Sequence, residues 1–96
     1  MVNPMDALGN PLRRQILVEL RKKPLSVGAL TAHFPVSRPA ISRHLKVLEA
    51  AGLVEARDRG ARSVYSIRVQ GFRAVQSFLD SFWDAALSRL EELAKE

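Results

Sequence analysis

The stretch VSRPAISRHLKVLEAAGLV, from Val36 to Val54, carries closely spaced side chains that can bind a polyanion. Ser42, Arg43 and Lys46 lie within it at helical spacing. An arginine can form a bidentate contact with O6 and N7 of guanine, a serine can hydrogen-bond a base edge, and either cation can neutralise a phosphate. This combination predicts contact with a nucleic acid, and the alternative is an ordinary solvated helix face.

The two histidines offer little to a metal ion or to catalysis. His44 has no carboxylate four residues away on either side, His33 stands alone, and the chain contains no cysteine. We therefore interpret His44 as a packed or phosphate-bonding residue rather than a metal ligand. The sequence shows no nucleophile–base spacing and no glycine-rich phosphate loop. We expect no metal site, no cofactor and no enzyme, although a deep pocket with converging polar groups would reopen the last point.

A helix over residues 37–51 must present the polar side chains. Ser37 is its expected N-cap, Pro39 is tolerated in the first turn, and Gly52 is expected to end it in a left-handed conformation. At about 100° per residue, three apolar side chains fall on one buried stripe. These are Ile41, Leu45 and Leu48.

The opposite face of this helix holds the candidate reading residues. Ser42, Arg43 and Lys46 lie on it beside small residues, which let a helix approach base edges closely. Arg38, at the helix start, can reach a phosphate or a base edge.

Two shorter patterns precede this helix. Residues 6–23 predict a first helix with Asp6 as a possible cap and a break or late start at Asn10-Pro11. Residues 26–34 predict a short second helix capped by Ser26 and stopped by Pro35. The short helix and tight turn are what a reading helix needs to be held across a DNA backbone.

After Gly52 the apolar period changes from helical to alternating, which predicts a β-hairpin over residues 53–69. Val54 and Ala56 share one face of the first strand, and Tyr65, Ile67 and Val69 share one face of the second. Arg59 and Arg62 flank Gly60 at the tip, where long cations can reach phosphates or a minor groove. The alternative for the hairpin arginines, Arg57 and Arg68 above all, is cross-strand pairing with Glu55 or Asp58.

Residues 71–95 predict a long final helix with an unusually broad apolar arc. We expect this helix to form a homodimer, because a small domain can hardly cover so much apolar surface on one side. Packing within the chain accounts for part of the arc. The expected dimerisation residues are Phe78, Phe82, Trp83, Leu87 and Leu90.

Composition places limits on the whole chain. Its 96 residues predict one domain, 1–96, and the net charge of +5 is unevenly distributed. Residues 1–70 hold twelve Lys and Arg against five Asp and Glu, whereas residues 71–96 hold three against five. A basic excess attracts DNA, RNA or an anionic membrane surface. Without cysteine, a signal peptide or a long apolar run, we expect a cytoplasmic protein that does not span a membrane.

The predicted order is helix, short helix, helix, hairpin, helix. It is mainly α with a small β-hairpin and is typical of a winged helix-turn-helix, which binds double-stranded DNA. The segments DALGNPLRRQILVEL, VSRPAISRHLKVLEAAGLV and RDRGARSVYSI resemble the first helix, recognition region and wing of ArsR-type transcriptional repressors. The resemblance implies a homodimer on a palindromic operator, formed through the first and last helices, and it places Ser42, Arg43 and His44 at or near DNA.

The chain departs from the metal-sensing members of that family. Where those members carry a cysteine motif, it has VGALTAHF, and its last helix has Asp80 and Asp84 but no histidine. It therefore resembles the metal-independent members, whose signal is another ligand, a protein or none. The alternative function is a winged-helix adaptor that binds a protein or RNA, marked by binding without sequence preference.

Overall fold

The computed structural model describes residues 2–95 and divides the expected first helix in two. Helix α1 spans Pro4–Ala7 and α2 spans Pro11–Lys22. The break expected at Asn10-Pro11 is confirmed, whereas the start at residue 6 is wrong. Each proline occupies the first turn of a helix of its own, where its missing N–H costs nothing. Asn3 and Asn10 are the two N-caps, with side-chain oxygens that accept from Met5 N at 2.8 Å and Arg13 N at 3.1 Å. Asp6 is therefore not the cap.

The helix-turn-helix consists of α3, Val27–Thr31, and α4, Arg38–Ala50. Ser26 and Ser37 are the N-caps, as the sequence predicts. The short helix ends at Thr31 rather than at residue 34, because the N–H groups of His33 and Phe34 form tighter i to i−3 hydrogen bonds, to Leu30 O and Thr31 O.

The end of α4 is a Schellman motif. Gly52 has φ of +78° and donates to Glu49 O, while Leu53 N donates to Leu48 O. Both Leu48 and Leu53 are fully buried, so the apolar contact that accompanies this motif is present. The chain therefore leaves α4 at a fixed angle and enters the sheet directly.

The sheet is antiparallel in the order β1-β3-β2. Strand β2 spans Val54–Arg59 and β3 spans Arg62–Ile67, and Gly60, with φ of +64°, makes the turn. The sequence did not predict the two-residue β1, Leu25–Ser26, which pairs with β3 through Leu25 and Tyr65. Val69, expected at the end of the second strand, is in the last helix instead.

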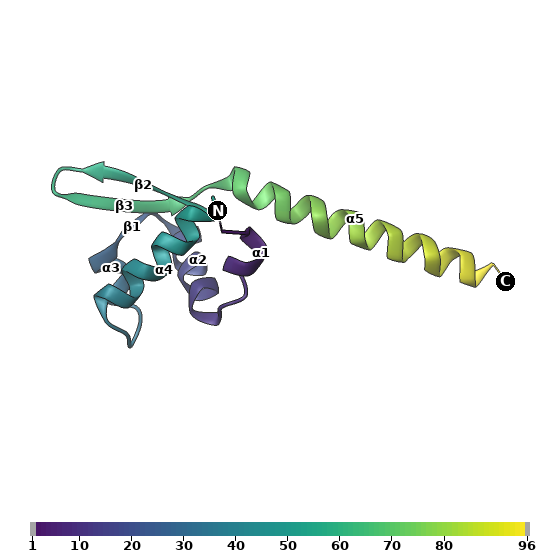
Figure 1. Ribbon diagram of the computed structural model, residues 1–96, viewed down its shortest axis with the longest axis horizontal. Helices are drawn as coiled ribbons and strands as arrows, with labels where there is room; N and C mark the ends of the chain where they lie inside the picture. The colour runs from purple at the N-terminus through teal and green to yellow at the C-terminus, as the bar shows by residue number, and fades with distance from the viewer. Residues whose placement is uncertain (1, 96) are drawn as a thin grey trace.

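The core lies where α2, α3 and α4 pack against one another and against the root of the sheet (Figure 1). The predicted stripe of α4 is confirmed, since all three of its residues are fully buried. The largest fully buried side chains are Ile16, Leu30, Ile41, Leu45, Leu48, Leu53 and Val54.

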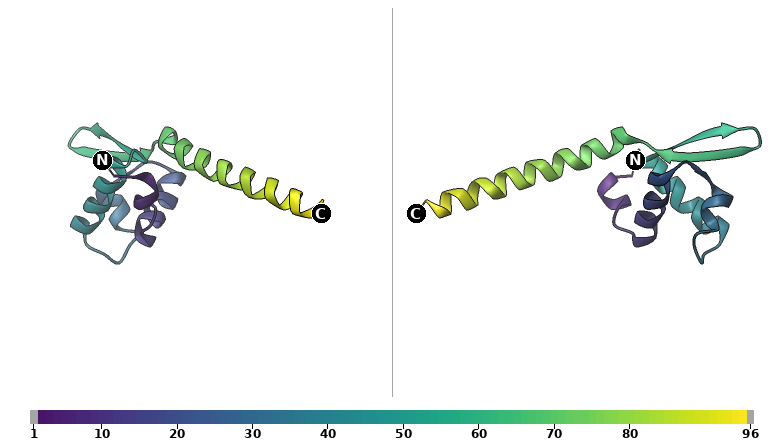
Figure 2. Two further views of the ribbon diagram at one scale, coloured as in Figure 1. Left: turned by 45° about the vertical axis from the view of Figure 1, so that its right-hand side comes forward. Right: turned by 180° about the vertical axis from the view of Figure 1, so that it is seen from behind.

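Helix α5 spans Val69–Ala94 and projects away from this core, so that the molecule extends 64 × 25 × 25 Å (Figures 1 and 2). It begins two residues before the expected Gly71. A Cβ atom at Gly71 would overlap the backbone of Gly52, so glycine lets the first turn of α5 pack directly on the end of α4. None of the residues of α5 is buried.

Candidate nucleic-acid interface

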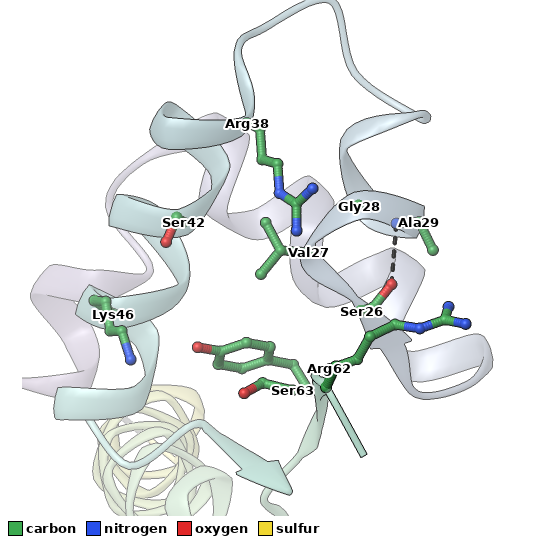
Figure 3. Close-up of a pocket in the computed structure, with 11 residues that line it drawn as sticks. Ser26, Val27, Gly28, Ala29, Arg38, Ser42, Lys46, Arg62 and Ser63 are labelled. Carbon is green, nitrogen blue, oxygen red and sulfur yellow. Dashed lines mark hydrogen bonds between the residues drawn. The ribbon is translucent and has the colours of Figure 1, made fainter. Parts of the chain in front are cut away.

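An open cleft of about 660 Å³ separates α4 from the wing formed by β2 and β3. Arg38, Ser42 and Lys46 line it from successive turns of α4, and Arg62 lines it from the wing (Figure 3). The first turn of α3, with Ser26 and Gly28, closes one end. Three cations and no carboxylate line the cleft, so its chemistry suits an anion.

Arg38 lies across the gap between the two helices of the helix-turn-helix. Its side chain points from the start of α4 toward Gly28 (Figure 3), and Nη1 lies 3.8 Å from the position that a Cβ of Gly28 would take. Glycine at this point leaves room for the guanidinium beside α3. The planar donors of Arg38 thus lie at the mouth of the cleft, where they can take a phosphate oxygen in bidentate fashion.

Lys46 is the second cation of the cleft and is fully charged at neutral pH. The Tyr65 phenol and the Glu49 carboxylate hold the pKa of Lys46 above its ordinary value. The Nζ atom of Lys46 lies 3.5 Å from Glu49 Oε1. An exposed pair of this kind contributes little free energy, so Lys46 can exchange the carboxylate for a phosphate at small cost.

Arg43 lies on the exposed side of α4 and does not line the cleft. Within residues 2–95 its guanidinium makes no hydrogen bond or salt bridge. It therefore stands apart from the group formed by Arg38, Ser42 and Lys46, with all its donors available to a ligand in front of the helix.

Arg59 and Arg62 lie directly opposite each other at the tip of the wing. Both are exposed, and neither has a hydrogen-bond or ionic partner in the described part of the chain. The other hairpin arginines are engaged: Arg57 lies 3.6 Å from Glu55, while Arg68 donates to Gly52 O and Gln70 Oε1. Arg57 does pair with Glu55, but both residues lie on β2, so the expected cross-strand pairing is wrong, as is pairing of Arg68 with a carboxylate.

His44 lies on the other flank of α4, away from the cleft, and is half-buried. Its Nδ1 is 3.5 Å from Nη1 of Arg13, a residue of α2 that the sequence analysis missed. Burial and the charges of Arg13 and Arg43 lower the pKa of His44 below its ordinary value. The ring is therefore neutral at pH 7.

The dimerisation residues expected on α5 are all exposed. Phe78 and Phe82 are each 58% exposed and Trp83 is 57% exposed, and the rings of Phe82 and Trp83 meet edge to face at 5.7 Å. A shallow groove between α1 and α5, lined by Met5, Val75 and Phe78 among others, continues this apolar surface onto α1. A contiguous exposed apolar surface of this kind marks a site of interaction with another surface.

The described residues contain no cluster of three or more His, Asp and Glu side chains that could hold a metal ion. No described helix is long and apolar enough to cross a membrane. The lining of the cleft between α4 and the wing contains hydroxyl groups and cations but neither a histidine nor a carboxylate that could serve as a general base.

Comparison with known proteins places this site in a wider group. The model of the family described as "Bacterial regulatory protein, arsR family" matches residues 10–56, which span α2, α3, α4 and the start of the wing. The chain is 46% identical over 88 residues to the HTH-type transcriptional regulator Rv2034 of Mycobacterium tuberculosis, covering 92% of this chain and 82% of that protein. It is 34% identical over 67 residues to the transcriptional repressor SdpR of Bacillus subtilis, covering 70% and 74%.

Two solved structures extend the similarity to the whole fold. A possible transcriptional regulator for arsenical resistance superposes with a TM-score of 0.81 at 39% identity, over 94% of each chain. The homodimeric winged helix-turn-helix DNA-binding domain Mb0332 of Mycobacterium bovis superposes with a TM-score of 0.65 at 34% identity, over 78% of this chain and 73% of that one. Both matches confirm the mainly α winged helix-turn-helix that the sequence predicts.

Proposed function

The chain belongs to the arsR family of bacterial regulatory proteins and is a DNA-binding regulator of transcription rather than an enzyme. From this premise we propose that it is a homodimeric repressor that binds a palindromic operator. The observation that supports the proposal is the cleft between α4 and the wing. Three cations and Ser42 line it, with no carboxylate in its lining.

In the proposed complex, α4 enters the major groove, and its residues contact different parts of the DNA. Arg43, which is exposed and unpartnered within residues 2–95, reads a guanine, and Ser42 contacts a base edge or a phosphate. Arg38 and Lys46 bind the backbone that passes the cleft, and Arg59 and Arg62 of the wing bind the next phosphates along it. His44 contacts DNA from the other flank of the helix.

A second copy of this chain covers α5 in the proposed dimer. The apolar surface on α5 is continuous with the groove on α1, and the neighbour Mb0332 is itself a homodimeric domain. Two-fold symmetry presents two copies of α4 side by side, which requires an inverted repeat with half-sites about one helical turn apart.

Repression follows from occupancy, because a dimer that covers its operator excludes polymerase from the same DNA. The relative SdpR is a transcriptional repressor. The signal that releases this protein is not a thiophilic metal, since the chain has no cysteine to bind one.

Selection from duplexes with a random central segment, followed by footprinting on the selected DNA, tests the proposal. We expect enrichment of an inverted repeat, protection of two adjacent major grooves, and loss of transcription in vitro when the repeat overlaps a promoter. Enrichment of no motif, or tighter binding of RNA than of any duplex, would contradict it and favour the adaptor alternative. A selected motif at which the bound protein raises transcription would support sequence-specific DNA binding by α4 but contradict the role as a repressor.

A further inference from the structure

Arg13 makes three contacts that tie the first helices to α4. Its Nε donates to Ala7 O at 2.8 Å and its Nη2 to Asp6 O at 3.4 Å, both on α1, while Nη1 lies 3.5 Å from Nδ1 of His44. The first two bonds fix the plane of the guanidinium. The remaining donor is thereby directed at the His44 ring.

A guanidinium can only donate, so the His44 nitrogen that faces it must offer a lone pair. Burial is the main cause that keeps the pKa of His44 low, and two cations, Arg13 from α2 and Arg43 on α4 itself, add to it. The neutral ring then has its single proton on Nε2. Free neutral imidazole exchanges between two tautomers, and a partner on one nitrogen selects between them.

Arg13 and the wing lie on opposite flanks of α4. The cleft with Arg38 and Lys46 opens on the wing side, whereas Nδ1 of His44 faces Arg13 of α2, which is itself bonded to α1. The major groove is about 12 Å wide and is bounded by a phosphate backbone on each side. A helix that lies in the groove therefore meets phosphates on both flanks. On the flank beside α1 and α2, the half-buried His44 is placed to reach the phosphate backbone.

We propose that Arg13 is a positioning residue for DNA binding: it holds neutral His44 in the tautomer with the proton on Nε2, and this N–H donates to a phosphate oxygen on the flank of α4 opposite the wing. The phosphate contact rests on the proposed function. The tautomer is a property of the free protein and does not.

Nitrogen NMR of the free wild-type protein, with selectively labelled histidine, tests the first step without any variant. A ring nitrogen that lacks a proton resonates far from one that carries a proton, so the two tautomers are distinguishable at pH 7. We expect His44 to have an unprotonated Nδ1. A protonated Nδ1, or equal populations of both forms, would overturn the proposal.

Two variants separate positioning from packing. Arg13→Met removes the donors, and we expect the His44 tautomer to shift toward a mixture. Arg14→Met is the matched control, because Arg14 also caps α1, donating to Leu8 O at 2.8 Å, but has no bond to His44. We expect the control to leave the tautomer unchanged. Equal shifts in the two variants would show that loosening of α1, not the Arg13 contact, sets the ring.

Affinity for the selected duplex tests the second step. We expect Arg13→Met to bind roughly ten-fold more weakly than wild type, and Arg14→Met to bind like wild type. His44→Gln keeps a donor close to the position of Nε2, so in that background Arg13→Met should have little further effect. A tautomer that shifts without any change in affinity, or an undiminished effect of Arg13→Met in the His44→Gln background, would overturn the phosphate contact. Absence of any motif in the selection would instead contradict the proposed function and leave the tautomer result standing.

Discussion

Arg43 is the residue whose removal should change which DNA is bound. Its guanidinium is exposed on the outer side of α4 and unpartnered within residues 2–95. We expect Arg43→Ala to cost about 1–3 kcal/mol on the operator and to relax preference at one position per half-site. Titration of operator and random duplexes in parallel provides the measurement. A fall in affinity that is equal on both would mean that Arg43 binds phosphate and reads no base.

His44 should make the stability of the protein depend on pH. The pKa of the folded state is below the unfolded value of 6.5, so between these two values the unfolded chain binds the proton more tightly. Stability from this residue is therefore complete above pH 6.5 and falls as the pH is lowered toward the folded pKa.

Urea unfolding of wild type and His44→Gln at several pH values between 5 and 8 measures this difference. The free-energy gap between the two proteins should shift in favour of the variant on acidification, while contributions from His33 and the carboxylates cancel. A gap that stays constant with pH would contradict the burial and charge effects at His44.

The residues of the site could be predicted from sequence where they belong to one helix. The wheel of α4 separates Ile41, Leu45 and Leu48 from the polar face, and the buried stripe is as expected. Arg13 could not be found in this way, because it is 31 residues from His44 in the sequence. Its direction depends on the break between α1 and α2, which places two α1 carbonyl groups beside its guanidinium.

At the scale of elements, local chemistry predicts the type of an element better than its ends. Ser26, Ser37 and Gly52 mark helix boundaries because a side chain or a positive φ is needed at each, and the structure uses all three. Where no such residue stands, the ends shift, as at Thr31. Strand β1 has only two residues, too few for an alternating pattern, and it forms because Leu25 reaches Tyr65 across the sheet.

The wing should contribute affinity that is independent of sequence. Arg59 and Arg62 have no partners among residues 2–95, and each phosphate that they neutralise releases counterions. Replacing either by alanine should weaken binding to all duplexes alike and lower the slope of log K against log salt by about one per contact, or about two per dimer. Arg57→Ala makes the same change of charge further from the tip and is the comparison, because Arg57 must leave the Glu55 carboxylate, 3.6 Å away, to bind a phosphate. A changed ratio of operator to random affinity in the tip variants would reverse the roles of wing and helix.

For the whole molecule, the side chains available as metal ligands predict that metal ions do not change DNA binding. The chain has no thiolate, and its described residues bring no three His, Asp or Glu side chains together. Zinc, cadmium and arsenite at concentrations equal to that of the protein should therefore leave operator affinity unchanged in a fluorescence titration. A one-to-one complex that releases DNA would contradict this prediction.

The shape of the molecule makes dimerisation the prediction on which the others depend. Helix α5 has 26 residues, none of them buried, and it exposes to water an apolar stripe that runs from Phe78 to Leu93. Wild type should therefore sediment as a dimer at micromolar concentration, twice the chain mass of 10.7 kDa. A single 10.7 kDa species would refute the dimer.

Phe82→Ala should weaken the dimer by about 100-fold or more, because truncating a buried aromatic costs several kcal/mol and a two-fold interface contains the change twice. Ser88→Ala, on the polar side of α5, is the control. Phe82 makes no contribution to the buried core, so the helix-turn-helix should stay folded in the variant. A single half-site should then bind the variant as well as it binds wild type, while the full operator loses the advantage of two linked reading helices. An equal loss of affinity for the half-site and for the full operator would mean that α5 supports the fold of the domain. It would also mean that dimerisation adds nothing to operator affinity.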